Sequence, residues 1–347
     1  MRPLSSAVVV VAAGVLLAGC AASGVTSPTT SPTVVSSPAA GSLSASAPAT
    51  PPRTSPATTR TLTVTSALAP FKLPSAVSRP IVFPLGGGLL IVGGLTAADR
   101  TTPAILRVDL TSGSVQPAGG LPVPVHDAGG AVVGGRDLVF GGGSTAVTSA
   151  VQDVTPGSSP HLVSHLPQPR ADHVAVSAGK AGYVLGGFDG VQGSTSILRT
   201  LDGRTFTVVG ALPVSVRYPA VAVSGGSIWL FGGEHAGKQV SDVQRIDLAT
   251  GRGRVAGQLP RPLAHAGAFT LGGAIFLAGG RSGDAQRDAV MRFDPATVRF
   301  AAAGHLPGAR SDFGVAVDAD VAYLVGGESP KPVDTIVEVR AQPGGTP

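Results

Sequence analysis

The sequence predicts an all-β protein, a six-bladed β-propeller, because two dipeptides recur along it at fixed spacing. Six Leu-Pro pairs are each followed, twenty positions later, by a Gly-Gly pair. Successive repeats start 48, 45, 46, 47 and 47 residues apart, and a period in this range is typical of propellers and solenoids. The leucines are Leu73, Leu121, Leu166, Leu212, Leu259 and Leu306, and the first glycines are Gly93, Gly141, Gly186, Gly232, Gly279 and Gly326.

The composition also favours thin repeated units over one deep hydrophobic core, because only 4% of the 347 residues are aromatic. The formal charge of +5 comes from arginines that are scattered through the repeats. Nucleic-acid binders more often gather such charges in a run or on one helix face. We therefore expect no nucleic-acid partner.

The fifth repeat shows the predicted unit most clearly. Its short β-compatible runs, such as residues 275–278 and 289–293, are separated by Gly-Gly or Asp-Pro turns and show no helical period. Each repeat should be a four-stranded antiparallel meander. Tight turns between its third and fourth strands begin with an aspartate whose side chain is expected to bond its own backbone: Asp109, Asp202, Asp247 and Asp294.

The two ends of the repeat region predict a closed ring. After the last Gly-Gly pair only one β-like run remains, at residues 335–340, and an unmatched run at residues 61–65 precedes the first Leu-Pro pair. We expect residues 61–65 to supply the fourth strand of the last blade, so that residues 61–347 form one propeller with no free edge. The alternative is an open array with two exposed edges.

The first nineteen residues have the pattern of a lipoprotein signal peptide. Arg2 precedes an apolar stretch at residues 4–17, which is too short for a comfortable membrane span. The segment ends in Leu17-Ala-Gly-Cys20, which resembles a bacterial lipobox, and Cys20 is the only cysteine. We expect Cys20 to be lipidated and to hold the protein on the extracytoplasmic face of the cell membrane. The alternative is an uncleaved anchor helix.

Residues 20–60 form the predicted tether that follows this cysteine. They are nearly all Ser, Thr, Pro, Ala and Gly, with Arg53 and Arg60 as the only charges. Such a segment cannot bury enough apolar surface to offset the entropy lost on ordering, so we expect it to be disordered. Its Ser/Thr-Pro texture leaves O-glycosylation open.

The repeats resemble the kelch repeat over about residues 61–341. The resemblance rests on the apolar strand before Gly-Gly, the turn of the hydrophobic-Asp-x-x-Thr type, and the Pro-Arg-x-x-His pattern that ends at His173. The chain departs from the family by lacking the tryptophan of the fourth strand, since Trp229 lies on a second strand. In kelch propellers the usual binding surface is the face where the loops from fourth to first strand and from second to third strand emerge.

That resemblance makes a polar column in the repeats the candidate ligand-binding site. Five residues after each Leu-Pro proline stand Arg79, Asp127, Asp172, Tyr218, His265 and Asp312, and Glu234, Arg281 and Glu328 directly follow Gly-Gly pairs. We expect these side chains, with the neighbouring Arg170, Arg217 and Arg310, to form one mixed-charge mouth over the channel, suited to a sugar or a polar peptide. Alternatively they are solvated loop residues and salt bridges between blades.

The sequence gives no motif for a metal or a cofactor, so we expect neither. The histidines His126, His173, His235 and His265 have no metal-binding spacing. Copper-radical oxidases of the galactose oxidase type need a tyrosine crosslinked to a cysteine, and Cys20 is assigned to lipidation.

The expected function is therefore a non-catalytic, surface-anchored binding module for a cell-wall glycan or protein. The alternative is a sugar-active enzyme, an isomerase or hydrolase, that uses carboxylates and a histidine of the mouth. Catalysis would need a deep pocket with a carboxylate or histidine of shifted pKa, whereas binding tolerates an open rim.

Overall fold

The computed structural model describes residues 62–344, which form β-strands and no helix. The predicted signal peptide, Cys20 and the tether lie outside the described residues. Within residues 62–344 there is accordingly no helix long and apolar enough to cross a membrane.

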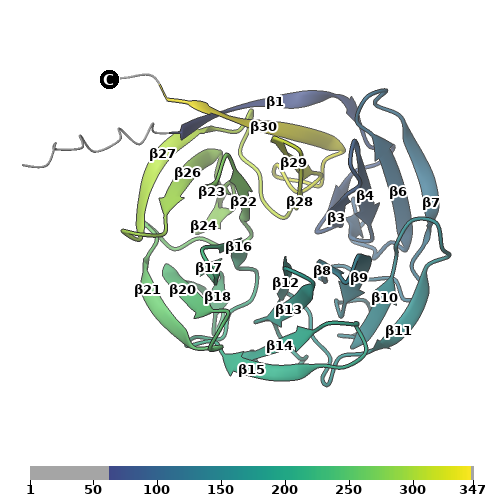
Figure 1. The fold of residues 1–347 in the computed structure, drawn as a ribbon. Coiled ribbons are helices and arrows are strands. Elements are labelled where there is room, and N and C mark those ends of the chain that lie inside the picture. Colours follow the sequence, from purple (N-terminus) through teal and green to yellow (C-terminus); the bar gives the residue numbers. More distant parts are fainter. Residues whose placement is uncertain (1–61, 345–347) are drawn as a thin grey trace, which may run out of the picture. The chain divides into compact units, whose positions relative to one another are not determined.

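Six four-stranded antiparallel sheets surround a central channel, as predicted for a six-bladed propeller (Figure 1). From the channel outward, blade 1 contains β3 (Ile81–Pro84), β4 (Gly88–Val92), β6 (Ala104–Asp109) and β7 (Val115–Gly120). Blade 2 contains β8 (Gly129–Val133), β9 (Arg136–Phe140), β10 (Ala150–Asp153) and β11 (His161–His165). Blade 3 contains β12 (Val174–Ala178), β13 (Ala181–Leu185), β14 (Ser196–Thr200) and β15 (Thr207–Ala211).

The other three blades repeat the same order. Blade 4 contains β16 (Ala220–Ser224), β17 (Ser227–Phe231), β20 (Asp242–Asp247) and β21 (Gly253–Gln258). Blade 5 contains β22 (Gly267–Leu271), β23 (Ala274–Ala278), β26 (Ala289–Asp294) and β27 (Arg299–His305). Blade 6 contains β28 (Gly314–Asp318), β29 (Val321–Val325), β30 (Thr335–Pro343) and β1 (Leu62–Lys72).

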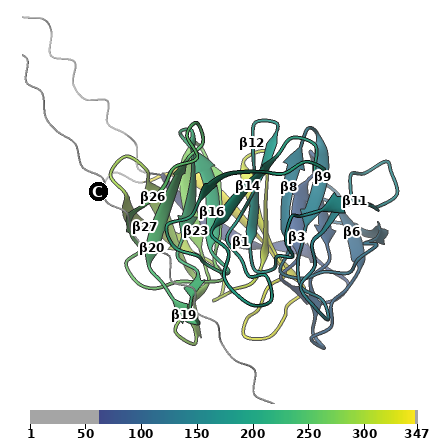
Figure 2. The same ribbon diagram turned by 90° about the horizontal axis from the view of Figure 1, so that it is seen from below.

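Two-stranded ribbons extend three of the loops at one end of the channel. They pair β2 (Val77–Ser78) with β5 (Leu95–Thr96), β18 (Glu234–His235) with β19 (Lys238–Gln239), and β24 (Arg281–Ser282) with β25 (Ala285–Gln286). Seen from the side, the strands run roughly along the channel axis, and β19 lies at the lower rim (Figure 2).

The hydrophobic core is divided into clusters that lie between neighbouring blades. One cluster, for example, joins Leu138 and Phe140 of blade 2 to Val184 and Leu198 of blade 3. The second strand of most blades is buried along its whole length, because it has a neighbouring blade on each side. This explains why these strands are continuous apolar runs and do not alternate with polar residues.

The ring is closed by its first strand, as the sequence predicted. β1 pairs with β30, with Leu62 opposite Pro343 and Thr65 opposite Arg340. Val64 of β1 is buried in the cluster between blades 5 and 6. The strand is longer than the five residues expected, because pairing with β30 continues to Lys72.

The Gly-Gly pairs allow each blade to receive the loop of the next one. The first glycine has a positive φ in every blade, and a Cβ at Gly141 would lie 2.2 Å from the carbonyl oxygen of Arg170. The second glycine donates its N–H to that same carbonyl, as Gly142 does to Arg170 at 2.7 Å. The predicted role of Gly-Gly, close backbone approach between crowded blades, is therefore confirmed.

The aspartates between third and fourth strands are structural, also as predicted. The Asp109 carboxylate accepts hydrogen bonds from the N–H and hydroxyl groups of Ser112 and from the N–H of Thr111. Asp247 accepts them from the hydroxyl and N–H of Thr250 and from the N–H of Ala249. These bonds hold the pKa of both carboxyls below the usual value.

Candidate functional site

The six residues of the polar column all have a left-handed backbone conformation, although none is glycine. Their φ angles are 57°, 52°, 58°, 52°, 58° and 58° for Arg79, Asp127, Asp172, Tyr218, His265 and Asp312. Each lies two residues before the innermost strand of its blade. Left-handed backbone cannot continue a β-strand, so it instead turns each loop across the end of the channel.

Backbone hydrogen bonds link these residues around the channel. The N–H of Asp172 donates to the carbonyl of Asp127, and the same bond joins Tyr218 to Asp172 and His265 to Tyr218. It continues from Asp312 to His265 and from Arg79 to Asp312, with N···O distances of 2.6 to 3.1 Å over the five links. These bonds use groups that strand pairing leaves unmatched, and they fix the positions of the side chains.

The residues after the Gly-Gly pairs lie at the same end of the channel, as expected. In each blade the residue before the column pairs with the residue after Gly-Gly, for example Arg217 with Glu234 and Ser311 with Glu328. The two loops of a blade thus meet as a short antiparallel bridge. We call this end of the channel the mouth, formed by Arg79, Asp127, Asp172, Arg217, Tyr218, Glu234, His265, Arg281, Asp312 and Glu328.

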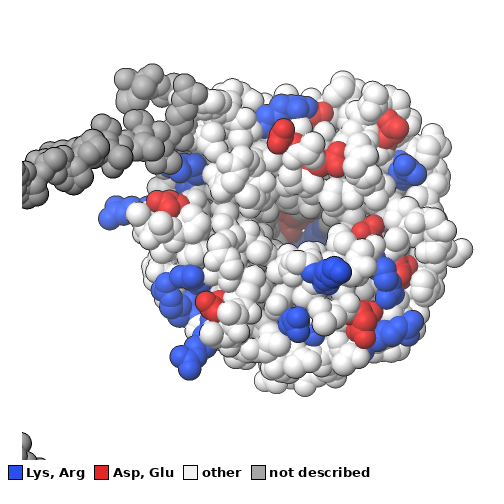
Figure 3. All heavy atoms as spheres, in the orientation of Figure 1, with Lys and Arg blue, Asp and Glu red and all other residues white. Residues whose placement is uncertain are grey.

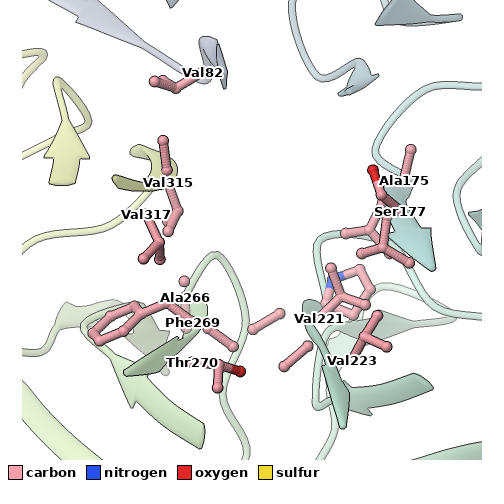
Figure 4. A pocket seen from close by; sticks show the side chains of 18 of the residues that line it. Val82, Ala175, Ser177, Val221, Val223, Ala266, Phe269, Thr270, Val315 and Val317 are labelled. Atoms are coloured by element: carbon pink, nitrogen blue, oxygen red, sulfur yellow. The ribbon is translucent and has the colours of Figure 1, made fainter. Parts of the chain in front are cut away.

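The six column residues line a cavity of about 170 Å³ at the mouth. The rest of the lining comes from the residues that directly follow the column or begin an inner strand, namely Pro80, Ala128, His173, Val174, Pro219, Ala266 and Phe313. Below it the channel widens to a hollow of about 510 Å³ that no charged side chain lines. Figure 4 shows Val82, Val221, Val223 and Val317 directed into this hollow. Val174, Pro219, Ala266 and Phe313 line both spaces, so the polar cavity opens into an apolar one.

Asp312 is the most heavily used carboxylate of the mouth. It accepts hydrogen bonds from His265 Nδ1 at 2.6 Å and Ser311 Oγ at 2.6 Å, and it pairs with Arg281 and Arg79 at 3.2 and 3.3 Å. Its side chain is only 1% exposed. Burial alone would raise the pKa of Asp312, but these cationic partners hold it well below the usual value.

His265 lies between two carboxylates. Nδ1 contacts Asp312, and Nε2 lies 3.3 Å from Glu234 Oε1. Burial would lower the pKa of His265, but the hydrogen bonds to Asp312 and Glu234 outweigh it and raise the pKa to about 9. Both ring nitrogens therefore donate, and the ring is an imidazolium stacked on Tyr218 at 4.1 Å.

The stability of the propeller is expected to fall as pH rises from 6.5 to about 9. The folded state holds the proton of His265 to higher pH than the unfolded state does, so its contribution is complete below 6.5 and is lost through about 9. At about 1.4 kcal/mol for each pH unit, the loss is of the order of 3 kcal/mol at most. Urea unfolding of the wild type and of His265→Gln at several pH values in this range measures the loss. An equally steep decline of the unfolding free energy in both proteins would contradict the prediction.

Asp127 is a second group of the mouth whose pKa is shifted. Burial raises its pKa to about 7, although the neighbouring Arg79, at 3.0 Å, opposes this. The folded state favours the protonated form of Asp127. The contribution of this group to the stability of the propeller is therefore lost as pH rises from 3.8 to about 7. The cavity thus contains a carboxyl that can gain or lose a proton near neutral pH.

Arg217 was expected in the mouth as a neighbour of the column, and the structure places it there. Its guanidinium bonds Asp172 through Nε at 2.6 Å, and it lies over the rings of Phe188 and Tyr218 at 4.7 and 5.2 Å. The signal in the sequence was its place directly before the column. With Arg217, all nine predicted residues are brought to one end of the channel.

Arg170 and Arg310, in contrast, do not belong to the mouth, so their expected place there was wrong. Arg170 is buried and donates to the carbonyls of Gly186 and Ser196, and Arg310 donates in the same way to Gly326 and Thr335. They stand two residues before the column, where the other blades have an apolar residue that points into the blade. Their role is to hold loops together.

Among the histidines, His173 is buried and accepts a hydrogen bond from the Gly129 N–H, and burial lowers its pKa to about 3. In residues 62–344 no three His, Cys, Asp or Glu side chains are grouped so that they could hold a metal ion.

The fold and the mouth define the class as a six-bladed β-propeller, and a comparison with solved structures agrees. The chain is similar to the structure titled "Structure of YjhT", with a TM-score of 0.66 and 17% identity. The match covers 78% of this chain and 98% of the other. No protein-family model matches the sequence, and a search of curated proteins gave no match. At this level of identity the likeness concerns the fold.

Proposed function

We propose that this chain is a kelch-type propeller that binds a cell-envelope glycan or protein through its mouth, and that a lipid on Cys20 anchors it to the outer face of the cell membrane. The observation that carries the proposal is the ring of six left-handed residues. Each costs about 1 kcal/mol or more of backbone strain, and none is glycine, which would adopt the same conformation freely. Retaining large polar side chains there supports a role for the side chains themselves.

The exposure of the charged groups indicates which ligand the mouth favours. Arg217, Arg281 and Arg79 have side chains that are 39%, 29% and 25% exposed, whereas the carboxylates of Asp172 and Asp312 lie beneath them. A ligand therefore meets mainly guanidinium donors whose charge is largely balanced from below, with Glu234, 25% exposed, as an accessible carboxylate. Such a surface suits a polar ligand that is rich in hydroxyl and carbonyl acceptors, and Tyr218 adds an aromatic ring.

The experiment that tests this function is a combined binding and activity screen of the full chain. On an array of cell-envelope glycans, the protein is expected to bind saturably and to convert none of them. Binding that persists unchanged when Tyr218 and Arg281 are both replaced by alanine would contradict the mouth as the site.

A sugar-active enzyme, an isomerase or hydrolase, is the second candidate. It is favoured by the proximity, in one cavity, of Asp127 with a pKa of about 7 and the imidazolium of His265. These are a proton acceptor and a proton donor of displaced pKa, which is what acid and base chemistry on a sugar requires. Turnover that is lost in Asp127→Asn and His265→Gln, with binding retained, would favour this candidate over pure binding.

The anchor is tested separately. Cys20→Ala is expected to abolish incorporation of labelled fatty acid and to release the protein from the membrane fraction. The result follows because the thiol is the only group that can form the thioether, and Cys20 is the only cysteine. Retention on membranes without lipid label would show an uncleaved anchor helix.

A further inference from the structure

Blade 4 places two arginines directly opposite each other. Arg245 of β20 pairs with Arg254 of β21, so their side chains leave the same face of the sheet. Like charges at such a position are destabilising unless another group neutralises them. The pair therefore has a cost that the fold does not require.

The other blades show that the fold does not require two opposed arginines. The equivalent arginines of the third strand lie opposite neutral residues: Arg107 faces Gln116, Arg199 faces Thr207, and Arg292 faces Ala301. In blades 2 and 6 the third-strand position is acidic, with Asp153 and Glu338. Among the six blades only the fourth opposes two cations.

A hollow of about 370 Å³ adjoins this pair, and Arg252 supplies a third guanidinium. Within residues 62–344, none of the three arginines forms a salt bridge. The only carboxylate in the lining is Asp247, whose Oδ1 accepts from the N–H groups of Ala249 and Thr250 and from Thr250 Oγ1. The hydrogen bonds from Thr250 lower the pKa of Asp247 most, and the charge of Arg245 contributes, so this one carboxylate partly balances the three arginines. In Figure 3, blue side chains gather at the lower left over β20 and β21.

Arg245 is held in place before any ligand arrives. Its Nε donates to Ser227 Oγ at 2.9 Å, and its guanidinium lies over the Trp229 ring at 5.5 Å. These contacts leave its two terminal nitrogens without a hydrogen-bond partner among the described residues, beside the exposed Arg254 and Arg252. A fixed guanidinium with unused donors suits the oxygens of a tetrahedral anion.

We propose that the hollow of Arg245, Arg252 and Arg254 binds a phosphate group, as a phosphomonoester or phosphodiester. Three guanidinium groups can surround one such anion, which would remove the repulsion across β20 and β21. The site lies at the opposite end of the propeller from the mouth. β1 begins at that same end, since Leu62 pairs with Pro343 whereas Lys72, which leads to the mouth, pairs with Thr335. A phosphate there can come from a membrane headgroup or from a free phosphorylated molecule.

The test compares two variants that remove the same charge, made in the full chain with Cys20→Ala so that no acyl chain contributes. Arg254→Gln breaks the proposed site, and Arg107→Gln is the matched control because its partner in blade 1 is Gln116. Inorganic phosphate is titrated by calorimetry at constant ionic strength. Arg254→Gln should weaken its binding at least about tenfold and Arg107→Gln should not. Phosphate should also raise the melting temperature of the parent protein but not of Arg254→Gln.

Vesicles distinguish the two sources. Preferential binding to phosphatidylglycerol over phosphatidylcholine, lost in Arg254→Gln and kept in Arg107→Gln, supports a headgroup ligand. Phosphate binding without this preference supports a free phosphorylated molecule. Absence of phosphate binding by the parent protein, or equal weakening in both variants, overturns the proposal. Arg254→Lys, which keeps the charge, covers the case in which Arg254→Gln fails to fold.

Discussion

Replacing Asp312 by alanine is expected to destabilise the propeller by about 3 to 5 kcal/mol, the usual cost of removing one partner from a buried ion pair. The carboxylate contacts His265, Arg281 and Arg79, and its side chain is almost wholly buried. Without it, Arg79 of blade 1 and His265 and Arg281 of blade 5 would lose the carboxylate that they share. A large part of a typical domain stability, about 5 to 15 kcal/mol, would be lost.

The same variant should also alter the pH profile. His265 would keep only Glu234 as a partner, so its pKa should fall and the decline in stability between pH 6.5 and about 9 should become shallower. Chemical unfolding of Asp312→Ala at several pH values measures both effects. Asp320→Ala is the control, because it removes an exposed charge from the same blade. Equal losses in the two variants would show that the mouth network does not stabilise the fold.

Deleting residues 1–72 is expected to abolish the soluble folded state, whereas deleting residues 1–61 should leave it intact. The longer deletion removes β1, which exposes the edge of β30 and uncovers the cluster that contains Val64. An unpaired, apolar edge strand is prone to pair with other chains, so aggregation is the expected result.

Size-exclusion chromatography and thermal unfolding of the two truncated proteins make this measurement. The shorter truncation is the matched control because it ends one residue before β1. Equal melting temperatures for the two proteins would contradict closure of the ring by the first strand.

Much of the fold could be predicted from the sequence because its repeats impose it. The Gly-Gly pairs have a backbone role that only glycine fills well, and the Leu-Pro pairs keep a constant distance from them. The unmatched run before Leu73 predicted the closing strand, since each blade needs four strands. Its extension to Lys72 could not be predicted, because β1 reads as a mixed polar and apolar segment and follows the register of β30.

Most residues of the mouth could be predicted, but their backbone geometry could not. The constant distance from each Leu-Pro pair identified the column residues in the sequence. Nothing about Arg79 or Tyr218 indicates the left-handed backbone that they adopt. The sequence also does not show which of the arginines near the column faces the channel. Arg217 lies in the mouth, whereas Arg170 is buried in a blade. That difference depends on which way each loop residue points once the backbone has turned.

Titration of the ligand found by the screen against three variants tests the central claim most directly. If the mouth binds it, Tyr218→Ala and Arg281→Ala should each weaken the affinity by about 1 to 3 kcal/mol, the scale of a lost central or charged contact. Asp109→Ala, which breaks a turn at the other end of the propeller, should leave the affinity unchanged. An affinity that falls in Asp109→Ala and is unaffected by both mouth variants would show that the ligand binds elsewhere.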